Sequence, residues 1–315
     1  MTKTRRILVT GGAGFVGSHL VDKLVVQGHS VTVIDDLSSG KLYRVNKDVT
    51  FYHTSITSPT IPEIIRQDKP EVIFHHAASA SVAKSVRDPV FDASTNINGT
   101  LRIIEASKDI GVDMLVFAST GGALYGEPKT LPCTEDHAKN PLSPYGVSKL
   151  VGEQYLHLYN RIYGLKSTCL RYGNVYGPRQ DPMGESGVVA IFSRLMIDGR
   201  QPKIHGSGDQ EKDYVFIDDV VGANIIAMES GVGGTYNIGS GIGTSVNKIF
   251  ESLAHILEYS WRPTHGPERS GDVSKIILDI SKARQILGWN PRISLEDGLS
   301  RTIDHLRASS EYDKF

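Results

Sequence analysis

The sequence contains few cysteines, almost no net charge and no long apolar run. Only two of its 315 residues are cysteines, Cys133 and Cys169, and its 34 basic and 35 acidic residues give a formal net charge of −1. Two cysteines without metal-ligand spacing exclude a disulfide framework and predict a reducing, cytoplasmic location. The balanced charge excludes a basic nucleic-acid surface. No run approaches the roughly 20 apolar residues that span a bilayer.

Repeats, low-complexity tracts and charged tails are also missing from the sequence. With 39% hydrophobic residues over 315 positions, the chain can bury one large core or two modest ones. We therefore expect a compact soluble protein with neither nucleic acid nor a membrane as partner.

The first forty residues carry the pattern of a dinucleotide-binding unit. The apolar run Arg6–Thr10 predicts a buried parallel strand, followed by a glycine-rich turn, a helix, and a second strand that ends on Asp35. Glycines at 11, 14 and 17 allow a tight turn, close approach of a pyrophosphate, and contact between helix and strand. The helix N-terminus, at Phe15 and Val16, adds N–H groups and a positive dipole.

Asp35 is expected to select the cofactor. Its carboxylate can accept hydrogen bonds from both ribose hydroxyls and would repel a 2′-phosphate, which favours NAD over NADP. No arginine follows within residues 36–40 to reverse this preference. The predicted NAD contacts in this half of the chain are Gly11, Gly14, Phe15, Val16, Gly17, Asp35, Asp36, Leu37, Ser38, Gly40, Ser55, Ile56, Ala77 and Ala78.

Two further strands are predicted to end at the same edge of the sheet. Residues 71–78 form an apolar run that ends in small side chains, which let a cofactor approach the backbone. Residues 113–120 deliver the hydroxyls of Ser119 and Thr120 to that edge. His75 and His76 are adjacent on a strand and point to opposite faces, so we expect no metal site. A helix is predicted from about Asp88 to Lys108.

A helix that begins after Ser143 carries the candidate catalytic pair. Ser143 is a good N-cap and Pro144 suits a first turn, while Tyr145 and Lys149 fall four residues apart on one helix face. A free phenol has a pKa of about 10, and an adjacent ammonium favours phenolate. The pair is therefore predicted to accept the proton of an alcohol. A surface tyrosine beside a solvated lysine is the alternative interpretation of the same pattern.

Beyond Tyr172 the alternation of strand and helix weakens. We predict a loop over 173–179, short strands near 203–205, 214–217, 236–238 and 275–278, and helices near 187–198, 218–229, 245–258 and 294–308. The expected fold is α/β: a Rossmann-type doubly wound parallel sheet over residues 1–172, which some later segments rejoin. A smaller α/β carboxyl-terminal substrate-binding domain over 173–315 is expected to cap the carboxyl ends of the strands.

Together these motifs resemble the extended short-chain dehydrogenase/reductase family, and within it the UDP-glucose 4-epimerase group of nucleotide-sugar enzymes. The resemblance runs from Arg6 to about Leu306 and rests on residues 10–17, 35–37, 76–78, 96–99, 143–149, 170–174 and 269–272. It implies NAD-dependent 4-epimerisation of UDP-glucose and UDP-galactose, with the N-acetyl forms left open. It also implies a homodimer that pairs through the helices near 88–108 and 144–163.

The resemblance further implies roles for individual residues. Tyr145 would be the base, Lys149 its partner and a nicotinamide-ribose ligand, and Thr120 a hydroxyl that binds the sugar. Asn96 and Tyr172 would join the NAD contacts. The implied substrate contacts are Thr120, Asn174, Val188, Val189, Lys203, His205, Lys212, Arg269 and Asp272.

Several positions depart from the family pattern. The segment after Ser119 is one residue longer than in many epimerases, so Ser119 could take the role of Thr120. Ala80 stands where some members have a cofactor-binding lysine, and Ser55 where an aspartate usually approaches adenine. Lys212 replaces a more common arginine and loses its bidentate geometry.

Three other functions compete with 4-epimerisation. A 4,6-dehydratase needs an acid and a base where this chain has Gly121 and Gly122, which disfavours it. A UDP-glucuronate 4-epimerase or decarboxylase needs a cation for the sugar carboxylate, and Arg179 is the candidate. A non-catalytic NAD sensor would have no use for the intact Tyr145 and Lys149.

Overall fold

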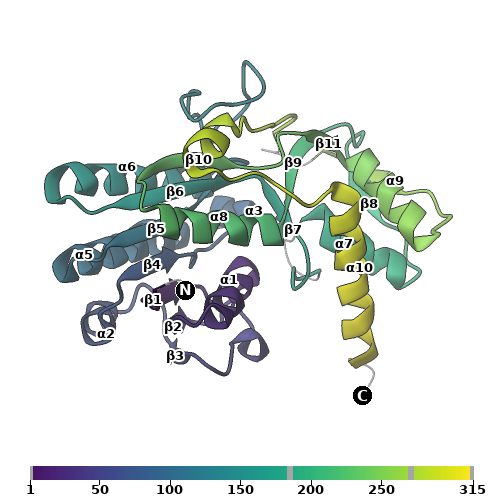
Figure 1. Cartoon of the computed structure of the whole chain (residues 1–315). Helices are drawn as coiled ribbons and strands as arrows, with labels where there is room; N and C mark the ends of the chain where they lie inside the picture. The colour runs from purple at the N-terminus through teal and green to yellow at the C-terminus, as the bar shows by residue number, and fades with distance from the viewer. Residues whose placement is uncertain (1–2, 183–186, 269–272, 313–315) are drawn as a thin grey trace.

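The centre of the molecule is a large parallel sheet. The structure is a computed structural model that describes residues 3–182, 187–268 and 273–312. Its seven-stranded sheet has the order β10-β6-β5-β4-β1-β2-β3, and all neighbours pair in parallel (Figure 1). The strands are β1 (Arg6–Thr10), β2 (Ser30–Asp35), β3 (Thr50–His53), β4 (Val72–His75), β5 (Met114–Thr120), β6 (Ser167–Tyr172) and β10 (Gly234–Ile238). The predicted Rossmann-type sheet is confirmed.

Helices cover both faces of this sheet. Helices α1 (Phe15–Val26) and α8 (Ile217–Ser230) lie side by side on one face, and α2 (Ile61–Asp68), α5 (Thr100–Ile110) and α6 (Pro144–Tyr163) cover the other (Figure 1). Ile7 and Val9 of β1 belong to the buried cluster under α1, and Leu8 belongs to the cluster under α2 and α5. Both faces are apolar because a parallel strand is covered from both sides.

The helical segment between β4 and α5 is broken into short pieces. Helices α3 (Val82–Arg87) and α4 (Pro89–Ala93) lead through a π-helical turn, η2 (Ser94–Gly99), into α5. The sequence predicted one regular helix over about 88–108. The π-helical turn changes the direction of the side chains in this stretch, and such turns are frequent at functional sites.

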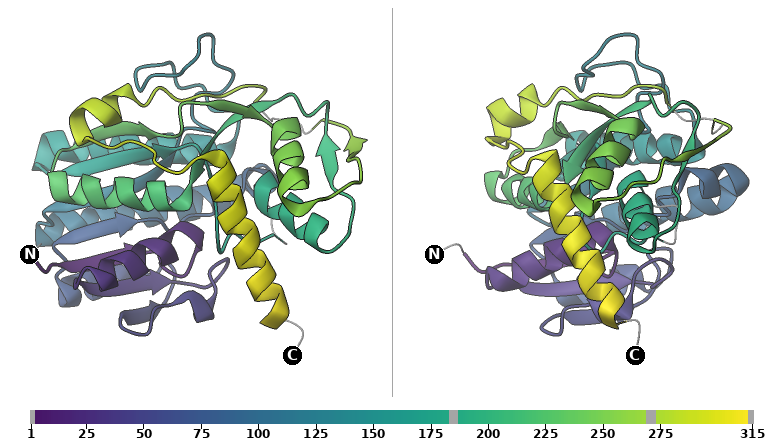
Figure 2. Two further views of the ribbon diagram at one scale, coloured as in Figure 1. Left: turned by 45° about the vertical axis from the view of Figure 1, so that its right-hand side comes forward. Right: turned by 90° about the vertical axis from the view of Figure 1, so that its right-hand side faces the viewer.

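A smaller region sits beside the carboxyl ends of the strands (Figure 2). It holds a three-stranded sheet in the order β11-β9-β7 and a two-stranded sheet formed by β12 and β8. Its elements are β7 (Asn174–Tyr176), α7 (Val188–Ile197), β8 (Lys203–His205), β9 (Glu211–Phe216), β11 (Gly243–Ser245), α9 (Val246–Leu257), β12 (Thr264–Gly266) and α10 (Leu295–Tyr312). The helix η1 (Leu42–Arg44) follows β2, and η3 (Ala283–Leu287) precedes α10.

Three sequence predictions about this half of the chain were wrong. The strand at 236–238 was expected in the smaller region, but β10 extends the large sheet beside β6, because α8 packs on α1 and returns the chain to that edge. The predicted loop at 173–179 contains β7, which pairs with β9. Residues 275–278 form isolated bridges, Lys275 to Glu211 and Leu278 to Cys133, because this segment passes two different partners. The boundary between residues 172 and 173 stays a prediction.

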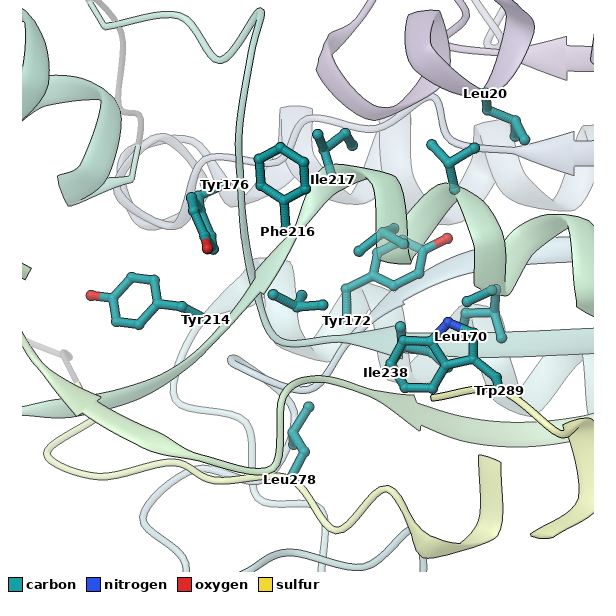
Figure 3. Packing of buried hydrophobic residues seen from close by; sticks show 14 of the residues in the cluster. Leu20, Leu170, Tyr172, Tyr176, Tyr214, Phe216, Ile217, Ile238, Leu278 and Trp289 are labelled. Carbon is teal, nitrogen blue, oxygen red and sulfur yellow. The ribbon is translucent and has the colours of Figure 1, made fainter. Parts of the chain in front are cut away.

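The two regions share one hydrophobic core. Tyr172 and Ile238 of the large sheet belong to the same buried cluster as Tyr176 and Phe216 of the smaller one, as Figure 3 shows. The rings of Tyr176 and Phe216 meet edge to face with centroids 5.6 Å apart. Trp289 donates its indole N–H to the carbonyl of Asp219 at 2.9 Å and ties the segment before α10 to α8. This shared core fixes the smaller region at the carboxyl edge of the sheet.

Among the described residues, no helix combines the length and the apolar character needed to cross a membrane.

Candidate active site

A cleft of about 740 Å³ opens at the carboxyl ends of the strands. Its wall is built from the turn after β1, the segments after β2, β3 and β4, the ends of β5 and β6, the start of α6, and residues that follow β7. Fifteen of the predicted NAD residues line it: Gly11, Gly14, Phe15, Val16, Gly17, Asp35, Asp36, Ser38, Ser55, Ile56, Ala77, Ala78, Tyr145, Lys149 and Tyr172. The other three, Leu37, Gly40 and Asn96, lie behind this wall.

The glycine-rich turn is shaped by close contacts. Gly11 has φ of +73°, and a Cβ there would lie 2.6 Å from the backbone nitrogen of Ala77. A Cβ on Gly17 would overlap the carbonyl of Gly11, so helix α1 can approach the turn only without a side chain. At Gly14 the only neighbour of an added Cβ would be that same carbonyl, at 3.2 Å. This turn therefore leaves room at the N-terminus of α1 for a pyrophosphate.

The Asp35 carboxylate is fixed at the end of β2. It accepts the N–H of Ala13 at 2.9 Å and the N–H of Leu37 at 2.8 Å. Burial raises the pKa of Asp35 above its ordinary value, and these two hydrogen bonds oppose the rise. Leu37 adopts φ of +57°, and a Cβ on Gly40 would lie 2.7 Å from Asp35 Oδ1. Leu37 and Gly40 therefore shape the surroundings of the carboxylate.

Helix α6 carries Tyr145 and Lys149 into the cleft. Ser143 accepts the N–H of Gly146 at 3.2 Å as the N-cap, and the helix ends at Gly164 in the left-handed conformation, as predicted. Lys149 is 4% exposed and donates to the carbonyl of Ala118 at 2.8 Å. Its Nζ lies 5.9 Å from the centroid of the Tyr145 ring. A solvated surface lysine is thereby excluded.

The ionisation of this pair differs from the sequence prediction. Burial raises the pKa of Tyr145 above its ordinary value, and the nearby Asp92 carboxylate raises it further. Burial lowers the pKa of Lys149 to about 8, while Asp92, Glu153 and Cys169 oppose that decrease. Lys149 was expected to lower the pKa of Tyr145, whereas burial of the phenol and then the Asp92 carboxylate set the direction of its shift in this structure. The phenol is therefore neutral near pH 7 in the protein by itself.

The two hydroxyls at the end of β5 have different surroundings. Ser119 is 3% exposed, and its Oγ donates to Glu153 Oε1 at 2.5 Å. Thr120 Oγ1 accepts the N–H of Ala123 at 3.1 Å. A Cβ built on Gly122 would lie 3.9 Å from Thr120 Oγ1 and 3.3 Å from Asn174 Oδ1, so both groups lie close to Gly122. Ser119 lines the cleft together with Tyr145, although its hydroxyl is bound by Glu153, and Thr120 is not among the residues that line the cleft. Which of the two hydroxyls contacts a sugar stays a prediction.

His75 and His76 have separate partners, as their positions on a strand predict. His75 bonds Thr10 Oγ1 at 2.7 Å and Thr100 Oγ1 at 2.9 Å. His76 bonds Asn224 Oδ1 at 3.2 Å and stacks on Tyr172. Desolvation lowers the pKa of both rings, to about 4 for His76. The described part of the chain holds no cluster of three or more histidine, cysteine or acidic residues that could bind a metal ion.

Asn96 lies behind the cleft wall and holds part of it in place. It is 2% exposed; its Oδ1 accepts the N–H of Ser79 at 2.8 Å, and its Nδ2 donates to the carbonyl of Ser79 at 3.0 Å. Nδ2 also donates to Asp92 at 2.8 Å. Because Ser79 lines the cleft and Asn96 does not, Asn96 positions the cleft wall through Ser79.

Six of the predicted substrate residues lie in the smaller region and are not among the residues that line the cleft: Asn174, Val188, Val189, Lys203, His205 and Lys212. Val188 and Val189 open α7, with Val189 fully buried, and Lys203 and His205 belong to β8. The amine of Lys212, on β9, donates to the carbonyl of Val273. Arg269 and Asp272 fall outside the described residues.

The sequence predictions missed several polar residues of the cleft, namely Lys41, Arg44, Lys84, Gln180 and Asp181. Lys84 of α3 lies four residues after Ala80, and its Nζ lies 4.2 Å from the centroid of the Phe91 ring. Gln180 and Asp181 reach the cleft from the segment after β7, which no local pattern places there.

Comparison with known proteins identifies the family. The model of the NAD dependent epimerase/dehydratase family matches residues 7–239. The chain belongs to this family. The matched residues include the glycine-rich turn and Asp35 on one wall of the cleft, and Tyr145 and Lys149 on another part. The predicted family and its dependence on NAD are confirmed.

Individual relatives are similar over nearly the whole chain. A UDP-glucose 4-epimerase of Mycolicibacterium smegmatis is 44% identical over 97% of this chain and 100% of its own length. The crystal structure of a Thermotoga maritima UDP-glucose 4-epimerase with UDP-glucose is 51% identical, with a TM-score of 0.95 over 96% of this chain and 99% of that one. A Thermus thermophilus UDP-glucose 4-epimerase in complex with NAD is 40% identical, with a TM-score of 0.92 over the same shares.

Proposed function

We propose that this family member is a UDP-glucose 4-epimerase. It would interconvert UDP-glucose and UDP-galactose by transient oxidation at C4 of the sugar, with Tyr145 as the base. The observation that carries the proposal is the position of Tyr145 and Lys149, which line the same cleft as the glycine-rich turn and Asp35. Relatives with this activity are similar over nearly the whole chain.

The residues of the cleft fit NAD. The glycine-rich turn excludes any Cβ at Gly11 and Gly17, and both oxygens of Asp35 are fixed for ribose hydroxyls. When bound, NAD supplies a hydride acceptor whose oxidised ring carries a positive charge. A positive charge beside Tyr145 would favour phenolate and offset the effect of burial on its pKa.

The side chains of this chain then divide the chemistry. With NAD bound as the hydride acceptor, the Tyr145 oxygen would take the proton of the sugar 4-hydroxyl as hydride leaves C4. It would return the proton when the hydride comes back to the other face of the turned 4-keto sugar. Lys149, held by the carbonyl of Ala118, keeps a positive charge near the phenol. Thr120 orients the sugar hydroxyl, and Asn174 lies near Thr120, beside Gly122.

The competing reactions are less compatible with these contacts. A Cβ on Gly121 would meet the Leu278 side chain at 2.6 Å, and Gly122 faces Asn174, so neither position offers the acid or base of a dehydratase. Arg179, the candidate cation for a glucuronate carboxylate, pairs with Asp22 of α1 at 2.7 Å. This ion pair holds the Arg179 guanidinium against α1.

Product analysis tests the reaction. The purified protein, supplied with UDP-galactose, is expected to form UDP-glucose until the two sugars reach equilibrium, with no net consumption of NAD. UDP-glucuronate is expected to remain unchanged. Loss of water or carbon dioxide from any substrate, or no turnover with either hexose, would contradict the proposal. Turnover of UDP-N-acetylglucosamine would widen the range of substrates without changing the reaction.

Substitution of the two hydroxyls at the end of β5 is expected to separate their roles. Thr120→Val should lower kcat by about 100-fold with little loss of stability, because it removes only the hydroxyl that faces the sugar. Ser119→Ala should lower the free energy of unfolding by about 1–3 kcal/mol, since Glu153 loses a buried partner, and should keep most of kcat. Steady-state kinetics and urea denaturation measure both effects. The opposite pattern would assign the sugar contact to Ser119.

A homodimer and a cytosolic location belong to this proposal. Exposed apolar side chains on α3, α4 and α6, such as Val86, Val90 and Ile162, support pairing through these helices. Light scattering that gives the mass of one chain at micromolar concentration would exclude the dimer. Both cysteines are free and buried, which agrees with a reducing compartment, and cell fractionation would test this.

A further inference from the structure

A buried carboxylate lies beneath the catalytic helix. Asp92 of α4 is 1% exposed. Its Oδ2 accepts the hydroxyl of Ser148 at 2.6 Å, and its Oδ1 accepts the Nδ2 of Asn96 at 2.8 Å. Both of these donors are neutral, and a carboxylate removed from water without a cationic partner is costly to keep in a fold. Asp92 lies in the first turn of α4, where the helix dipole favours an acid, but this exposed-helix effect does not require the carboxylate to be buried.

The two hydrogen bonds of Asp92 connect two parts of the cleft. Ser148 immediately precedes Lys149 on α6, so one bond holds the catalytic helix. Asn96 holds both backbone groups of Ser79, which lines the cleft after β4. Asp92 therefore sets the position of α6 relative to the cleft wall that follows β4.

The charge of Asp92 also acts on the candidate catalytic pair of α6. It raises the pKa of both Tyr145 and Lys149. The groups that face Lys149 from the other elements are His75 at the end of β4, His76 directly after it, and Cys169 of β6; Glu153 faces it from one turn further along α6. Glu153 is paired with Arg171 at 2.6 Å, which offsets its charge. Of the two carboxylates near Lys149 in the described structure, Asp92 is the one bound by neutral donors.

We propose that Asp92 is a positioning residue of the epimerase reaction. It fixes α6 against the cleft wall and supplies the negative charge that keeps Lys149 protonated at working pH. This role rests on the proposed function of Tyr145 and Lys149.

The Asp92→Asn variant tests the charge, because asparagine keeps the shape and one acceptor. The pH profile of kcat is expected to shift to lower pH by about one unit, since both ionisations lose a nearby negative charge. The KM for UDP-galactose should change little. NMR of isotope-labelled lysine gives a second measurement that does not depend on activity. The midpoint of the Lys149 titration should also move to lower pH. If Asp92→Asn does not fold, Asp92→Ser is measured in the same way with the same shift expected.

Two control variants separate charge from structure. Ser148→Ala keeps the carboxylate and removes one tether, so kcat should fall while the pH profile stays in place. Asp219→Asn alters another buried carboxylate bound by neutral donors, the N–H groups of Arg292 and Ile293, and should change stability alone.

An unshifted pH profile and an unshifted Lys149 titration in Asp92→Asn would overturn the proposal. If the parent protein epimerises UDP-galactose, that result rejects only the role of Asp92. If the parent forms no UDP-glucose, the proposed function itself fails.

Discussion

Tyr145→Phe is expected to lower kcat for epimerisation by about 10³-fold. The substitution removes one oxygen and leaves the ring. Lys149 keeps its hydrogen bond to the carbonyl of Ala118, and the N-cap of α6 does not involve the phenol. Binding of NAD and of UDP-sugar should therefore stay close to that of the parent. Initial rates with UDP-galactose measure the loss, and calorimetric titration with UDP measures retained binding.

A second tyrosine on the same helix provides the matched control. The hydroxyl of Tyr159 donates to Glu105 on α5, and Tyr159 lies about four turns from Tyr145 along α6 at about 3.6 residues per turn. Tyr159→Phe should leave kcat unchanged while it removes an identical oxygen. Substantial turnover in Tyr145→Phe would show that another group takes the proton of the sugar. Equal losses in both variants would point to a general effect on α6.

Arg171→Met is expected to lower the free energy of unfolding by about 3–5 kcal/mol. Arg171 and Glu153 are 4% and 5% exposed, and they are joined by two hydrogen bonds of 2.6 and 2.9 Å. Arg171 also donates to the hydroxyl of Tyr125 and to the carbonyl of Glu135, each at 2.9 Å. Removing the guanidinium leaves the Glu153 carboxylate buried without its cation. Urea denaturation measures the change.

A double variant tests the physical cause of that loss. Glu153→Gln combined with Arg171→Met removes both charges and keeps an acceptor for the hydroxyl of Ser119. We expect it to be more stable than Arg171→Met alone, because the uncompensated charge is the larger part of the cost. Equal stability of the single and double variants would assign the loss to packing and to the bonds with Tyr125 and Glu135. The same comparison measures how much the Arg171–Glu153 ion pair stabilises the end of β5, where Ser119 binds Glu153.

Local signals in the sequence determined the catalytic helix and the dinucleotide turn. Ser143 and Gly164 delimit α6 because an N-cap and a left-handed C-cap are properties of a few adjacent residues. Tyr145 and Lys149 share a helix face because of their spacing alone. The positive φ of Gly11 and the acid at the end of β2 follow from an equally local pattern.

Only the tertiary structure decided what depends on residues far apart in the chain. Ser119 is bound by Glu153, 34 residues later, and β10 lies beside β6 because α8 packs on α1. The direction of the Tyr145 pKa depends on desolvation, which exists only once the elements around the ring are assembled. Spacing along one element fixes which side chains share a face, whereas burial and the choice among hydrogen-bond partners arise from packing between elements.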